Sequence, residues 1–148
     1  MQETKVEDEF DSRWHEISEI LDALSGALFG VDGSSREFQS SDEARHVLRL
    51  SSEMASLLHA FVPWVYNLSV EYHKIRAARI VAQPIAGLFV YIDEVIYAKY
   101  PELEPEELKG IDNLHGNRNH CVIERANIDA LKSQIEQARS ELREAMDI

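Results

Sequence analysis

The sequence has few residues that cross-link a chain or interrupt its helices. It contains one cysteine, four prolines and six glycines among 148 residues. Because Cys121 has no second cysteine with which to form an internal disulfide, we expect a cytoplasmic protein. The first residues, Met1 to Glu9, are mostly polar and acidic and lack the basic-then-apolar order of a secretory signal.

Long hydrophobic runs and basic residues are also scarce. The longest run without an acid, a base or a histidine, Ile80 to Ile92, has 13 residues and contains Gln83, Pro84 and Gly87, whereas a membrane-spanning helix needs about 20 apolar residues. Lys and Arg number 15 against 27 Asp and Glu, for a formal net charge of −12. We therefore expect no membrane span and no direct binding to nucleic acid or anionic lipid, since both attract positive surfaces.

The apolar residues that are present recur at helical spacing. A first helix is predicted from the steps of three and four between Phe10, Trp14, Ile17, Leu21, Leu24 and Leu28. A second begins near Asp42, behind a capping box of Ser40 and Glu43, and its apolar face holds Val47, Leu50, Met54, Leu57 and Phe61. The last helix carries a short heptad seam, which favours burial in a bundle over an exposed dimer zipper: Ile128, Leu131, Ile135, Ala138, Leu142 and Ala145.

The middle of the chain is interrupted by Pro63 and Pro84, which lack the backbone N–H that a helix interior needs. A single helix over 42–100 would be about 88 Å long, so we expect at least one of these prolines to mark a reversal. The uncharged segment 85–92 is predicted to be the most buried. The fold class is therefore all-α: one domain over 1–148, an antiparallel bundle of about five helices with proline kinks, and a loop or short-helix insertion at about 101–120.

Acidic residues concentrate in two segments. Residues 1–22 hold eight acids and two bases, and residues 101–112 hold five acids and one base. Such surfaces attract a basic partner protein, although acids also favour helix N-termini and solubility. The candidate partner interface comprises Glu3, Glu7, Asp8, Glu9, Asp11, Glu102, Glu104, Glu106 and Glu107.

The basic cluster in this acidic chain is His73, Arg76 and Arg79, at steps of three along one helical stripe. It is a candidate anion site because Arg presents forked donors to phosphate or carboxylate. The favoured alternative is an internal ion pair, with the acidic first helix or with Glu71.

Metal and nucleophile motifs are weak. Glu43 and His46 have the Glu-x-x-His spacing of a di-iron bundle, but a second copy is missing. Asp112, His115, His120 and Cys121 are chemically suitable for zinc, yet their spacing matches no structural-zinc pattern. A reactive Cys121 paired with His115 or His120 is a further weak candidate. We therefore expect no cofactor and assign no catalytic residue.

The favoured function is a non-enzymatic acidic module that binds another, basic protein, as an inhibitor or an immunity or antitoxin-type neutraliser does. One alternative is a small-molecule- or metal-binding bundle, an enzyme among the options, with a pocket lined by His59, His73 or Glu71. Another is a self-assembling structural subunit, a homodimer joined through the C-terminal helix. A cluster of middle-chain aromatics, including Trp64 and Tyr97, fits core packing better than a binding surface.

Overall fold

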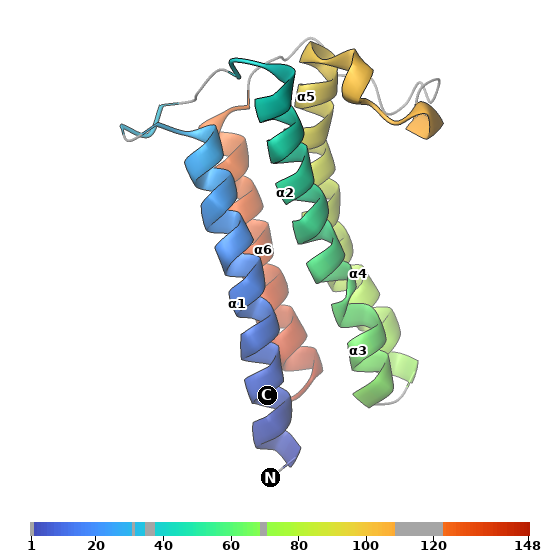
Figure 1. The fold of residues 1–148 in the computed structure, drawn as a ribbon. Coiled ribbons are helices and arrows are strands. Elements are labelled where there is room, and N and C mark those ends of the chain that lie inside the picture. Colours follow the sequence, from blue (N-terminus) through green and yellow to red (C-terminus); the bar gives the residue numbers. More distant parts are fainter. Residues whose placement is uncertain (1, 31, 35–37, 69–70, 109–122) are drawn as a thin grey trace.

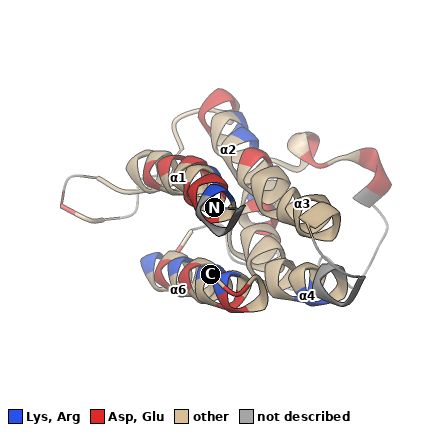
Figure 2. Cartoon of the chain, turned by 90° about the horizontal axis from the view of Figure 1, so that it is seen from below, with Lys and Arg blue, Asp and Glu red and all other residues tan. Residues whose placement is uncertain are grey.

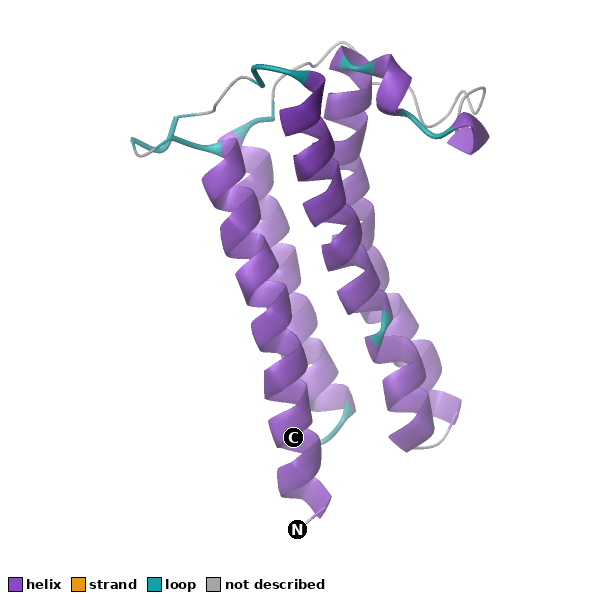
Figure 3. Cartoon of the chain, viewed as in Figure 1, coloured by secondary structure: helices purple, strands orange, loops and turns teal. Residues whose placement is uncertain are grey.

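The computed structural model describes residues 2–30, 32–34, 38–68, 71–108 and 123–148, with the backbone alone for 2–4, 71–74 and 108. Every regular element among them is helical (Figure 3). In chain order these elements are α1 (Gln2–Leu28), α2 (Ser41–His59), α3 (Phe61–Leu68), α4 (Glu71–Leu88), the π-helical turn η1 (Phe89–Asp93), α5 (Glu94–Lys99), the 3₁₀ turns η2 (Pro101–Leu103) and η3 (Glu106–Leu108), and α6 (Arg125–Ala145). The all-α prediction is confirmed.

These elements form four columns rather than five independent helices (Figure 1). The columns are α1, α2 followed by α3, α4 followed by η1 and α5, and α6. Helix α1 packs on α2, α2 on α4 and α4 on α6. Ion pairs from Arg143 of α6 to Glu7 and Asp11 of α1 join the first and last columns.

The predicted core faces are the observed ones. Of the six residues predicted on α1, all are buried except Leu21, which is partly buried, and on α2 Leu57 is the partly buried exception. The whole heptad seam of α6 is buried, so that face is already occupied within one chain. A homodimer through the C-terminal helix would have to use a different face of α6.

Neither proline lies at a chain reversal, and the predicted kinks are not confirmed. The chain turns between Leu68 and Glu71, and α4 continues through Pro84 (Figure 1). Pro63 is the third residue of α3, where a backbone N–H is not needed within the helix. Pro84 is buried between Val81 and Leu88, and packing of these neighbours keeps the helix together despite the missing hydrogen bond.

The prediction that 85–92 is the most buried segment is only partly correct. Leu88 and Ile92 are buried, but Val90 is 52 % exposed. The span Ile75–Lys99 is long and apolar enough to cross a membrane, with a mean hydropathy of 1.4, although a core helix meets the same criterion. Here one side of that span packs against α2 and α6.

Candidate functional site

The acidic residues of α1 divide into those paired within the chain and those left on the surface. Glu7 Oε1 lies 2.8 Å from Arg143 Nη2, and Asp11 Oδ1 lies 3.3 Å from Arg143 Nη1. Glu9 lies 3.1 Å from Arg13. These three carboxylates of the predicted interface are therefore partly neutralised, while the side chain of Glu3 is outside the described residues.

The second predicted acidic segment lies at the opposite end of the bundle. Turns η2 and η3 follow α5, whereas the N-terminal part of α1 is at the far end of its column (Figure 1). Glu102, Glu106 and Glu107 are exposed, but Glu104 is only 5 % exposed, so its side chain is not accessible to another protein. The structure thus does not join the two segments into one surface.

The surface acids that remain on the first two helices form what we call the acidic face: Asp8, Glu16, Glu19 and Asp22 of α1 and Glu53 of α2. All five are exposed. Seen along the bundle, acidic positions recur along α1, whereas the described parts of α3 and α4 are mostly uncharged (Figure 2). Of these five, Glu19 has a described ion-pair partner, His15, with Nε2 to Oε1 at 2.7 Å.

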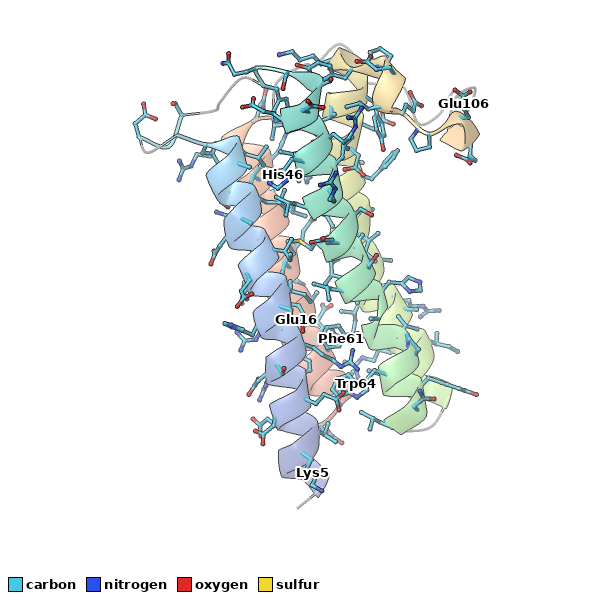
Figure 4. All side chains as sticks on the ribbon, in the orientation of Figure 1. Lys5, Glu16, His46, Phe61, Trp64 and Glu106 are labelled. Atoms are coloured by element: carbon cyan, nitrogen blue, oxygen red, sulfur yellow. The ribbon has the colours of Figure 1, made fainter. Side chains whose placement is uncertain are left out.

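A groove runs within this face between α1 and α2, with a volume of about 600 Å³. Helix α1 contributes Glu16, Glu19 and Ile20, and α2 contributes Arg49, Ser52, Glu53, Ser56 and Leu57. Ile20 and Leu57 are partly buried and pack on the core, so the groove has an apolar floor. Figure 4 shows Glu16 between the ribbons of the two helices, above Phe61 and Trp64.

Helix periodicity explains why the groove exists at this level. Ile20 and Leu57 lie at the edge of each helix's apolar stripe, where side chains only partly reach the core. The adjacent positions on α2 hold Ser52 and Ser56, whose small side chains leave the space open. Three acids and one base, Arg49, surround that space, so the groove carries a net negative charge.

Two of the three residues of the predicted anion site, Arg76 and Arg79, have described side chains. Arg76 Nη2 lies 3.8 Å from Glu144 Oε1 of α6, so an internal carboxylate already faces it. The favoured alternative to an anion site is an internal ion pair with the first helix or Glu71. The described ion-pair partner of Arg76 is Glu144. Arg79 is exposed on the outer side of α4, and the side chain of His73 is outside the described residues.

The metal candidates receive no support from the described residues. Asp112, His115, His120 and Cys121 all lie in 109–122, outside the described part of the chain. Among the residues that are described, no three His, Cys, Asp or Glu side chains come together as a ligand set. Glu43 instead caps α2: its N–H donates to Ser40 Oγ at 3.3 Å, and its carboxylate accepts from the Gln39 N–H at 2.6 Å.

One buried carboxyl group was not found from the sequence. Burial raises the pKa of Asp93 to about 7, against the lowering effect of a hydrogen bond from the Ser51 hydroxyl and with a smaller raising contribution from the nearby charge of Glu94. Ser51 is itself buried, at 1 % exposure. Within the described residues Asp93 Oδ1 has no hydrogen-bond partner. The pair Asp93 and Glu94 within an apolar stretch gives no sequence signal of this kind, because the burial of Asp93 depends on the π-helical turn that holds it.

The groove was also missed. Leu57 was assigned to a core face, and Glu16, Glu19 and Glu53 do not belong to the predicted interface set. Spacing places these residues on their own helices but does not tell how closely two helices approach. Comparison of the chain with protein-family models, with curated proteins and with solved structures finds no match, so the site's own geometry carries the functional argument.

Proposed function

We propose that this chain is a non-enzymatic module that binds a basic protein on its acidic face. The observation that carries the proposal is the location of the unpaired charge: Asp8, Glu16, Asp22 and Glu53 are exposed along α1 and α2, and no described ion pair engages them. The acids nearest α6, Glu7 and Asp11, form ion pairs with Arg143, whereas these four face solvent.

The net charge of −12 supports the same proposal. Like-signed charge on one face steers an oppositely charged partner during encounter and discriminates against partners of the wrong sign. The proposal includes an inhibitor or neutraliser of a basic protein, because an acidic face that binds a basic surface also covers it.

The test compares two triple charge reversals of equal size. The first, Asp8→Lys/Glu16→Lys/Asp22→Lys, alters the acidic face. The second, Glu102→Lys/Glu106→Lys/Glu107→Lys, alters exposed acids at the other end of the bundle. Tagged wild-type protein and both variants are incubated with lysate of the native host, washed at low salt and eluted at high salt.

We expect a stoichiometric basic protein to be retained by the wild type and by the second variant, and lost from the first. Circular dichroism must show that all three proteins are equally helical. Equal loss from both variants would contradict the proposal, because net charge rather than the acidic face would then control binding, and full retention by both would contradict it too, because the acidic face would then not be needed.

A second candidate function, self-association, is favoured by the outer face of α4. Ile75 is 53 % exposed and Val90 52 % exposed, with exposed alanines between them. No acid occurs from Ile75 to Ile92, so two copies can meet here without carboxylate repulsion. Analytical ultracentrifugation of Ile75→Glu/Val90→Glu beside the wild type tests this: a wild-type dimer that the variant lacks supports it, and a wild-type monomer at about 100 µM excludes it.

A further inference from the structure

We propose that the groove between α1 and α2 is the docking site for an amphipathic basic helix of the partner protein, with apolar anchors over Ile20 and Leu57 and lysine or arginine side chains toward Glu16, Glu19 and Glu53. This inference deepens the proposed function and depends on it, since it names the element that the acidic face receives.

The apolar floor of the groove is the reason that we expect apolar anchor residues on the partner helix. Ile20 and Leu57 are partly buried and continuous with the core, and they come from facing helices. A leucine, methionine or phenylalanine placed between them would remove apolar surface of both from water, which is the main source of affinity in a helix-in-groove complex.

The acidic rim of the groove is the reason that we expect basic residues on the partner helix. Glu16 and Glu19 on α1 and Glu53 on α2 surround the floor, so carboxylates are present on both sides of it. On a docked helix, residues three or four positions from an anchor lie on neighbouring parts of the same surface. Basic residues at those positions come within reach of this rim, whereas a phosphate backbone or an anionic lipid surface would be repelled by it.

The shape of the groove is the reason that we expect the partner segment to be a helix rather than an extended strand. Two helices form the walls, and within the described residues every regular element is helical, so no sheet edge is present there for strand addition. The lining residues of α2, from Arg49 to Leu57, extend along about 12 Å of helix, which matches two turns of a partner helix. Arg49 at one end makes an acidic or neutral partner residue favourable at that position.

The experiment uses the full chain and a fluorescent synthetic peptide of leucine and lysine, about 14 residues long, with leucines at helical i, i+4 and i+7 spacing. A scrambled peptide of the same composition and charge has no apolar face. Binding of each is measured by fluorescence anisotropy at about 50 mM and about 300 mM salt.

The blocking variant is Ser56→Trp, which fills the groove without changing charge, and its matched control is Ser140→Trp at an exposed position of α6. We expect the patterned peptide to bind at least about tenfold more tightly than the scrambled one. Ser56→Trp should remove that advantage, and Ser140→Trp should preserve it. Glu16→Gln/Glu53→Gln should weaken the patterned peptide about fivefold or more and reduce its salt dependence.

Three results would overturn the inference. They are equal binding of the two peptides, an unchanged affinity in Ser56→Trp, and a concentration-dependent dimer of the peptide-free chain that Ser56→Trp abolishes, because the occupant would then be a second copy. The proposed function is judged separately. If the charge reversal of the acidic face releases the host protein while Ser56→Trp does not, binding to a basic protein stands and the groove as its docking site falls.

Discussion

The two ends of the bundle are packed by different means. At one end, which we call the aromatic end, the rings of Phe10, Trp14, Phe61 and Trp64 contact one another, with centroids 5.4–5.9 Å apart. Toward the other, which we call the polar end, Ser51 and Asp93 place polar atoms among buried neighbours. Large rings gain from burial at any pH, whereas a buried carboxyl group is costly once it ionises. We therefore expect the contribution of the aromatic end to stability to be independent of pH and that of the polar end to fall as Asp93 ionises.

The largest effect is expected at the aromatic end. Phe61 is fully buried and contacts rings from both α1 and α3, so Phe61→Ala should lower the free energy of unfolding by about 3–5 kcal/mol. Urea denaturation measures this change in the free energy of unfolding. Leu68→Ala on the same helix is the control, since Leu68 is 45 % exposed and its truncation should cost less than about 1 kcal/mol. Equal costs for the two variants would show that the rings do not hold the helices together.

The next effect is at the polar end and depends on pH. The folded protein keeps a proton on Asp93 up to a pKa of about 7, whereas the unfolded chain loses it near 3.8. The unfolded state therefore binds fewer protons between these values, so stability falls as pH rises from about 4 to 7. Asp93→Asn should be more stable than the wild type by about 2–4 kcal/mol above pH 7.

The advantage of Asp93→Asn should shrink toward zero near pH 4, where both proteins are neutral at this position. Denaturation curves across this pH range test the sign. Asp129→Asn, at an exposed position of α6, controls for the loss of a carboxylate. A constant difference between Asp93→Asn and wild type at all pH values would mean that Asp93 is hydrated in the folded protein.

A smaller effect comes from the close approach of α4 and α6. A Cβ at Gly87 would lie 2.5 Å from Gln134 Oε1 and 3.1 Å from Leu131 Cδ1. The crowding should outweigh the higher helix propensity of alanine, so Gly87→Ala should cost about 1 kcal/mol. Gly26→Ala is the matched control, since nothing lies within 4 Å of its Cβ position, and it should stabilise the protein by about 0.5–1 kcal/mol. Thermal unfolding compares the two, and a stabilising Gly87→Ala would show that Gln134 and Leu131 move aside without cost.

The smallest effect is on the surface of the aromatic end. Arg143 pairs with Glu7 and Asp11 and lies 5.4 Å from the ring of Phe10. Because both carboxylates are about half exposed, with 48 % and 54 % of their side chains accessible, Arg143→Ala should cost about 1 kcal/mol or less. Urea denaturation at low and high salt should show the cost decreasing with salt. A salt-independent cost would assign the effect to packing on Phe10 instead.

The sequence predicted what is local to one helix. The core faces of α1, α2 and α6 follow from residues such as Trp14, Met54 and Leu131, because burial recurs with the period of the helix. What it missed depends on two elements meeting. The contact of Phe10 with Phe61, the groove beside Leu57 and the pairing of Ser51 with Asp93 each join residues more than 30 positions apart, and spacing within one helix carries no information about them. Proline was over-interpreted, since Pro63 falls in the first turn of a helix and Pro84 is held by its buried neighbours.

The π-helical turn Phe89–Asp93 sets the rotational phase of everything that follows it in its column. A π-turn accommodates one residue more than an α-turn, because its hydrogen bonds skip one further position. That extra residue turns α5 back by about 100° relative to a continuous α-helix, which brings Ile96 into line with Leu88 on the buried side. If the same residues formed a continuous α-helix, Ile96 and Tyr97 would turn by about 100° away from their buried positions, whereas deleting one residue from the π-turn would restore an α-turn and leave α5 in phase. The burial of Ile96 and Tyr97 therefore depends on the π-helical winding of this turn as much as on their hydrophobicity.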